Sequence, residues 1–116
     1  MGPRAGTLDA ATAQQPCCCP RYHEAVELVG KRWTGAILYV LLHGGRLRFT
    51  EIAQAVPDLS DRLLSERMKE LEARGIVKRH VSAGTPVRVA YELTEKGREL
   101  APAMAELKAW ADRWLD

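Results

Sequence analysis

The segment from residue 49 to residue 93 constrains the fold most, because it predicts two short helices, a tight turn between them and a hairpin after them. Thr50 and Ser60 stand where helices are expected to begin, since a hydroxyl there can accept a backbone N–H that has no partner inside the helix. Pro57 ends the first helix, because proline lacks an N–H and disfavours helical geometry in the preceding residue. The pattern predicts a helix-turn-helix with its corner at residues 57–59.

The second of these helices has one apolar side and one polar side. Leu64, Met68 and Leu71 recur at the spacing that lines one side of a helix, so this side is expected to face the core. The opposite side carries a short set of polar side chains of mixed charge, namely Arg62, Ser65, Glu66 and Lys69. A helix that enters the major groove of DNA needs such a side, although a helix that only faces solvent has one too.

A hairpin is predicted directly after that helix. Gly75 is expected to end the helix, residues 76–81 form a first strand, and apolar and polar side chains alternate strictly over residues 87–93. The linker between the strands contains Gly84 and Thr85. The chain is therefore predicted to be mainly α-helical with a small β-hairpin, an α+β arrangement of the winged helix-turn-helix kind.

Three cations, Lys78, Arg79 and Arg88, lie on the predicted hairpin. Such side chains can reach phosphate or the minor groove beside a recognition helix. A solvated hairpin with no ligand carries the same charges, which then serve only solubility. The position of this hairpin after a helix-turn-helix favours a DNA-binding wing.

Helices are also predicted at both ends of the domain. Residues 21–29 place Tyr22 and Val26 on an apolar stripe. The next helix ends at Gly44 and Gly45 and supports the motif; the spacing predicts that its core side consists of Trp33, Ala36, Ile37, Val40 and Leu41. The last helix carries the longest stripe, which includes Leu100, Met104, Leu107, Trp110 and Trp114. So long a stripe exceeds what a small core needs, which predicts a dimer through the terminal helices; the alternative is a helix that packs only on its own domain.

Five segments now fall in one order: Cys19-Pro20, Gly30-Lys31-Arg32-Trp33, Arg48-Phe49-Thr50-Glu51-Ile52, Leu64-Ser65-Glu66-Arg67-Met68-Lys69-Glu70-Leu71-Glu72 and Tyr91-Glu92-Leu93-Thr94-Glu95-Lys96-Gly97. Together they make residues 19–116 resemble an HxlR-type winged helix-turn-helix regulator. The resemblance implies a bacterial transcription factor that acts as a homodimer, with residues 60–69 in the major groove and the Gly84 hairpin as its wing. Asp61 and Glu66 add negative charge where the family often has amides, so the operator sequence does not follow from relatives.

All three cysteines are consecutive, at Cys17, Cys18 and Cys19. They lie between residues 1–18, which are expected to form a mobile tail, and the first helix. An odd number of thiols leaves one for an intermolecular disulfide or an adduct. The resemblance implies an oxidant or electrophile sensor at Cys19, where a helix start and Arg21 would lower the pKa of the thiol; an inert buried thiol is the alternative.

Other functional classes find little support in the sequence. Cys17, Cys19 and His23 give no second pair of ligands, so no metal and no other cofactor is expected. No phosphate loop or catalytic constellation is present, which argues against an enzyme. The longest apolar run has seven residues, against the roughly 20 that a membrane span needs, and no secretory signal precedes it, so no membrane partner and a cytoplasmic location are expected.

A net charge of only +2 means that affinity for DNA has to come from locally placed cations. The expected function is that of a sequence-specific regulator, a repressor, which binds double-stranded DNA as a homodimer on a palindromic operator. An oxidant or a small hydrophobic molecule is its expected effector. The alternative is a dimeric winged-helix module that binds proteins and not DNA.

Overall fold

A computed structural model describes residues 19–116, and the chain divides after Gly30 into two compact units. The described part of the first unit contains one helix, α2 (Pro20–Val29), with proline in its first turn, Cys19 as its N-cap and Gly30 as its C-cap. None of its side chains is buried. The predicted tail at residues 1–18, with Cys17 and Cys18, lies outside the described residues.

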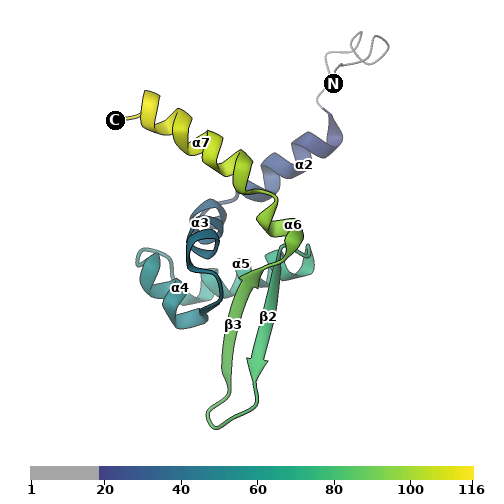
Figure 1. Cartoon of the computed structure of the whole chain (residues 1–116), viewed down its shortest axis with the longest axis vertical. Helices are drawn as coiled ribbons and strands as arrows, with labels where there is room; N and C mark the ends of the chain where they lie inside the picture. The colour runs from purple at the N-terminus through teal and green to yellow at the C-terminus, as the bar shows by residue number, and fades with distance from the viewer. Residues whose placement is uncertain (1–18) are drawn as a thin grey trace. The chain divides into compact units, whose positions relative to one another are not determined.

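The second unit, Lys31–Asp116, contains every other described helix and strand. In chain order these are α3 (Thr34–Gly44), β1 (Leu47–Arg48), α4 (Phe49–Ala55), α5 (Asp61–Ala73), β2 (Val77–Ser82), β3 (Arg88–Leu93), α6 (Glu95–Arg98) and α7 (Ala101–Trp114). Figure 1 shows α4 and α5 beside α3, with the long hairpin of β2 and β3 extending away from them. This arrangement confirms the predicted mainly helical winged helix-turn-helix.

The caps of the two motif helices differ from each other. Ser60 caps α5 as predicted, because its hydroxyl accepts the N–H of Leu63 at 3.1 Å. The prediction for Thr50 was wrong: the cap position of α4 is Arg48, two residues before Thr50, and the helix begins at Phe49. There the Arg48 N–H donates to the Glu51 carboxylate at 2.7 Å, so the side chain of the third helical residue satisfies the N–H of the cap residue.

The core is formed by the apolar sides of α3, α4 and α5 and by the base of the hairpin. Leu64, Met68 and Leu71 of α5 are buried, as their spacing predicted. In α3 the predicted core side was wrong in part: Val40 is only half-buried, and Leu38, which the prediction left out, is buried. That helix is apolar on nearly every side over residues 36–42, so periodicity alone sets its orientation poorly.

The turn from α5 into the hairpin depends on Gly75. Its φ of 74° lies in the left-handed region, where glycine is not strained. The Gly75 N–H donates to the Glu72 carbonyl at 3.0 Å, and the Ile76 N–H donates to the Leu71 carbonyl at 2.9 Å. These two bonds form a Schellman motif, which ends α5 and directs the chain into β2.

The sheet has three antiparallel strands in the order β1-β3-β2. Val77 pairs with Leu93, and both are buried on the face toward the helices. The third strand, β1, was not predicted, because two residues are too few to show an alternating pattern. It joins the sheet through the pairs Leu47 with Tyr91 and Arg48 with Ala90, and so brings the segment before α4 alongside the hairpin.

Candidate nucleic-acid interface

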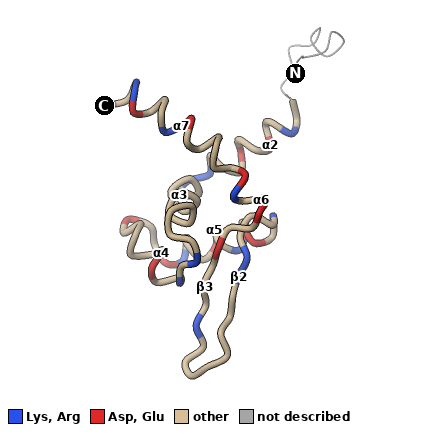
Figure 2. Tube along the Cα trace, viewed as in Figure 1, with Lys and Arg blue, Asp and Glu red and all other residues tan. Residues whose placement is uncertain are grey.

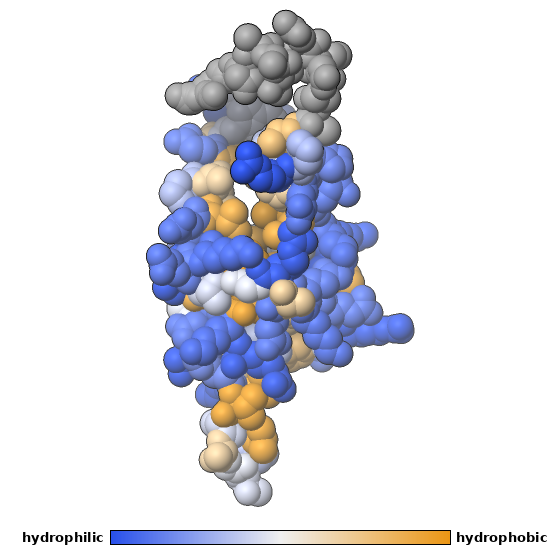
Figure 3. Space-filling view, turned by 90° about the vertical axis from the view of Figure 1, so that its right-hand side faces the viewer, coloured by the Kyte–Doolittle hydropathy of each residue, from blue (hydrophilic) through white to orange (hydrophobic). Residues whose placement is uncertain are grey.

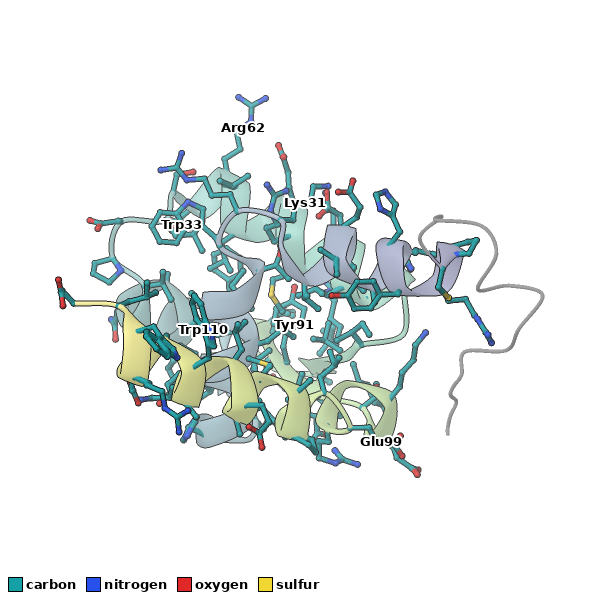
Figure 4. All side chains as sticks on the ribbon, turned by 90° about the horizontal axis from the view of Figure 1, so that it is seen from above. Lys31, Trp33, Arg62, Tyr91, Glu99 and Trp110 are labelled. Atoms are coloured by element: carbon teal, nitrogen blue, oxygen red, sulfur yellow. The ribbon has the colours of Figure 1, made fainter. Side chains whose placement is uncertain are left out.

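The polar side of α5 is exposed. Arg62, Glu66 and Lys69 face solvent and Ser65 is half-buried, whereas the apolar side of the same helix is in the core. The Arg62 side chain is 91% exposed and points away from the rest of the unit (Figure 4). Its Nε lies 3.6 Å from a carboxylate oxygen of Glu66, one turn along the helix. Because exposed pairs of this kind are weak, Arg62 is free to exchange Glu66 for a ligand.

A buried arginine that the sequence analysis did not single out orients α5. The Arg67 Nε donates to the Arg32 carbonyl at 2.9 Å, and its Nη1 lies 3.4 Å from Glu70. The Lys31 Nζ reaches Glu70 at 2.8 Å from the same segment, which precedes α3. The Lys31 hydrogen bond, with Arg67 nearby, holds the pKa of Glu70 below its ordinary value. Arg67 lies between Leu64 and Leu71 on the inner side of α5, and this position was the only sign in the sequence that it would be buried.

The hairpin does not present its cations on one surface. Arg79 is paired with Tyr91 and therefore shares the face toward the helices, although its own side chain is exposed. Lys78 is paired with Glu92, and Arg88 with Ser82, on the opposite face. The predicted wing cations are thus divided between two faces by the register of the sheet.

The distal loop of the hairpin carries no charge. Residues 82–87 include exposed Thr85 and exposed Val87, and Figure 2 shows the cations on the strands and not at the tip. Figure 3 likewise shows hydrophobic and weakly polar side chains gathered toward the end of the hairpin. Charged contacts to a ligand therefore have to come from the strands.

The polar residues around the first motif helix have different surroundings. Thr50 is exposed in the first turn of α4 and lines a hollow together with Arg88 of the hairpin. Ser60 is exposed, but its hydroxyl is engaged at the cap of α5. The structure therefore brings Thr50 toward the hairpin, which its distance along the chain did not indicate.

Cys19 occupies the cap position of α2 and is exposed. The backbone N–H groups of Tyr22 and Arg21 lower the pKa of its thiol below the ordinary cysteine value, and the Arg21 side chain adds to this effect. A lowered pKa increases the fraction of reactive thiolate at neutral pH.

Within residues 19–116 no three His, Cys, Asp or Glu side chains are grouped in a way that could hold a metal ion.

The residues predicted for dimerisation are more exposed toward the ends of the chain. Tyr22 and Val26 are exposed on α2. Leu107 and Trp114 on α7 are about two-thirds exposed, and Trp110 is 53% exposed. Leu100 and Met104 are half-buried at the other end of α7, where Met104 faces α3 across a small hollow. No helix in the described part of the chain is long and apolar enough to cross a membrane.

The model of the HxlR-like helix-turn-helix family matches residues 28–116. The chain belongs to this family. The uncharacterised HTH-type transcriptional regulator YvaP of Bacillus subtilis (strain 168) is 52% identical over 98 residues, which are 84% of this chain and 90% of YvaP. The HTH-type transcriptional regulator YodB of the same organism is 47% identical over 98 residues, 84% of this chain and 87% of YodB. The chain is thus an HxlR-like helix-turn-helix transcriptional regulator, and its family is one of regulators and not of enzymes.

Solved structures of such regulators have the same fold. The reduced form of YodB from B. subtilis superposes with a TM-score of 0.76 at 46% identity, covering 86% of this chain and 97% of YodB. Its quinone-bound form gives a TM-score of 0.73 at 44% identity, over 84% of this chain and all of that one. The redox regulator HypR in its oxidised form gives 0.76 at 36% identity, over 84% of this chain and 99% of HypR.

Proposed function

We propose that this HxlR-like regulator represses transcription as a homodimer that holds α5 of each subunit in the major groove of a palindromic operator. The observation that carries the proposal is the division of α5 into two sides. One side is buried in the core and tied by Arg67 to the segment before α3, and the other presents Arg62, Glu66 and Lys69 to solvent. A rigidly mounted helix with an exposed arginine can read base edges, because its guanidinium matches the two acceptors of guanine.

The apolar side of α7 supports the homodimer. Leu107, Trp110 and Trp114 expose large aromatic and aliphatic surfaces that the rest of their own unit does not cover. Aromatic anchors of this kind dominate the energy of protein interfaces. A two-fold dimer would present its recognition helices about 34 Å apart, one turn of DNA, which is why we expect palindromic half-sites.

Oxidants and electrophiles are the proposed signal, and Cys19 is the proposed sensor. Its thiol is exposed and its pKa is lowered, and the related regulators YodB and HypR have been solved in quinone-bound and oxidised forms. With a quinone, the Cys19 thiolate would form a C–S bond to a ring carbon. The displaced electron pair moves to the carbonyl oxygen, and proton transfers from and to water then give the hydroquinone thioether. Cys17 and Cys18 are the candidate partners for a disulfide.

A small hydrophobic effector is the second proposed signal, and its proposed site is in the described part of the chain. A hollow of about 310 Å³ lies between α3 and α7, lined among others by Tyr39, His43 and Met104. Its volume is at the lower end of the range for ligand pockets, roughly 300 Å³ and above.

Because chromosomal DNA lies in the cytoplasm of bacteria, the proposal puts the regulator there.

The test is binding of the pure protein to the DNA upstream of its own gene, measured by fluorescence anisotropy at several salt concentrations. Reduced protein is compared with protein treated with benzoquinone or diamide, and wild type is compared with Cys19→Ser. Cys18→Ser is the matched control for the benzoquinone treatment, which needs no second cysteine. We expect operator DNA to bind more tightly than random DNA, and treatment to release it from wild type but not from Cys19→Ser.

Two outcomes would contradict the proposal. If treatment with benzoquinone or diamide also releases DNA from Cys19→Ser, Cys19 is not the sensor. Equal affinity for operator and random DNA would remove the sequence-specific regulator and favour the alternative, a dimeric module that binds proteins.

A further inference from the structure

Polar contacts connect α5 to two other segments of its unit, and these segments lead to opposite ends of the chain. The first segment contains Lys31 and Arg32, which directly follow Gly30 at the end of α2. The second contains Thr94 and Lys96, which lead through α6 into α7. The helix with the proposed sensor and the helix proposed for dimerisation are thus connected to α5 by separate sets of contacts.

The first set of contacts includes a buried guanidinium. The Arg67 side chain is only 11% exposed, and its Nε donates to the Arg32 carbonyl at 2.9 Å. A buried N–H that loses its acceptor costs more than the hydrogen bond itself contributes, so this carbonyl and this guanidinium should move together. Lys31 adds an ion pair with Glu70 at 2.8 Å (Figure 4). A displacement of Lys31 and Arg32 therefore acts on α5.

The turn that carries these two residues has a strained backbone. Trp33 has a φ of 75°, in the left-handed region, where a residue other than glycine is strained. The Arg32 guanidinium lies 5.4 Å from the centre of the Trp33 ring and helps to hold this conformation. The Thr34 N–H, which donates to the Lys31 carbonyl at 3.0 Å, also helps to hold it. A shift of the turn would release the strain, which favours a second conformation of this segment.

The same turn is the covalent continuation of α2. Gly30 ends that helix, since its N–H donates to the Val26 carbonyl at 2.8 Å, and only Lys31 separates Gly30 from Arg32. So short a connection leaves little slack to absorb a movement of α2. Such a movement is therefore transmitted to the two residues that contact α5.

The second set of contacts holds the other end of α5. The Lys96 Nζ donates to the carbonyl of Arg74, the last residue of that helix end, at 2.6 Å. The Thr94 N–H donates to the Ile76 carbonyl at 3.0 Å, and Gly97 lies so close to this carbonyl that a side chain would collide with it. None of these contacts involves the turn before α3.

We propose that Lys31, Arg67 and Glu70 transmit a movement of α2 to the recognition helix α5, and that the contacts of α6 do not. The inference rests on the proposed function, in which Cys19 at the start of α2 is modified and α5 reads the operator. When α2 moves, the turn leaves its strained conformation. Arg32 then takes the Arg67 guanidinium with it and reorients α5. Arg67 is thus a positioning residue, which sets how strongly the modification changes the affinity for DNA.

The experiment measures the operator dissociation constant of the full-length dimer after and before treatment with benzoquinone, and takes the ratio of the two. In wild type this ratio should be about tenfold or more, within the usual range for coupled sites. Arg67→Met removes the buried donor but keeps an unbranched side chain among apolar neighbours, and its ratio should fall to within about twofold of one. Lys31→Gln, at an exposed position, should lower the ratio by a smaller factor.

Lys96→Gln is the matched control for Lys31→Gln, because it removes a lysine that contacts the other end of the same helix. Its affinity is expected to fall equally before and after treatment, so its ratio should equal that of wild type. Mass spectrometry of each treated variant measures the adduct at Cys19, which separates loss of the chemistry from loss of its transmission. A purely structural role of Arg67 would lower both affinities and leave the ratio unchanged.

Two results would overturn this inference alone. The first is a wild-type ratio in both Arg67→Met and Lys31→Gln when Cys19 is fully modified. The second is an equal loss of the ratio in Lys96→Gln, which would show that no particular set of contacts transmits the change. If circular dichroism shows that Arg67→Met does not fold, Lys31→Gln decides. A wild type that does not bind its operator, or that stays bound once Cys19 is modified, removes the proposed function and this inference with it.

Discussion

The helices α5 and α7 have similar amphipathic patterns, but the apolar side is buried in α5 and exposed in α7. In α5 the apolar side is buried by its own unit, and Leu64 is fully enclosed. In α7 no side chain is buried, and Trp110 and Trp114 remain exposed. An apolar stripe thus predicts that a surface will be covered and does not say by which chain. For α5 the cover is intramolecular, whereas for α7 we propose a second copy.

The largest effect should come from breaking the core contact of α5. Leu64→Ala removes a fully buried side chain and leaves a cavity, so the free energy of unfolding should fall by about 2–5 kcal/mol. Chemical denaturation followed by circular dichroism measures this change. Leu107→Ala on α7 is the matched control, and an equal loss in that variant, measured below the dimer dissociation constant, would show that α7 packs on its own unit.

A second change tests the cover of α7 directly. Trp110→Ala should weaken the homodimer by about 2 kcal/mol or more, because exposed aromatic anchors carry interface energy. Sedimentation equilibrium should then show monomer at concentrations where wild type is dimeric, with an unchanged far-ultraviolet spectrum. A wild type that is monomeric at every concentration would contradict the proposed dimer before the variant is made.

The outer side of α5 can be compared with the wing by two substitutions. Arg62→Ala should weaken operator binding by about 1–3 kcal/mol and relax base preference nearby. Arg88→Ala should weaken all DNA sequences to a similar extent and flatten the salt dependence, because it acts on phosphate. Anisotropy titrations on operator and scrambled DNA give both quantities, and identical profiles for the two variants would refute the separate roles.

The smallest effect concerns Cys19, the residue that caps α2. Like α7, α2 buries none of its side chains. Since the N–H groups of Tyr22 and Arg21 lower the pKa of the Cys19 thiol, its thiolate should form at lower pH than that of an ordinary cysteine. The rate of alkylation by iodoacetamide should therefore reach half of its maximum at lower pH in Cys17→Ser/Cys18→Ser protein than in a short unstructured peptide. A midpoint equal to that of the peptide would show that the helix start does not activate the thiol.

Much of the second unit was predictable from signals that act within a few residues. The cap at Ser60, the end of α5 at Gly75 and the buried stripe of Leu64 and Met68 all depend on contacts within about one helical turn or on periodicity. Such signals are local, so the sequence displays them directly. The DNA-binding residues, the limits of the domain at residues 19–116 and the dimer stay predictions.

The tertiary structure alone decided which distant residues meet. Arg46 and Glu92 are 46 positions apart, and only the pairing of a two-residue strand with β3 brings them together. Arg67 is buried where its guanidinium reaches the carbonyl of Arg32, 35 positions away, and no local pattern predicts that contact. Local sequence determined where α5 begins and ends and that a hairpin follows it, because capping and periodicity are short-range. The pairing of Arg46 with Glu92 and the burial of Arg67 required the folded chain, because strand pairing and ion pairs join residues that are distant along it.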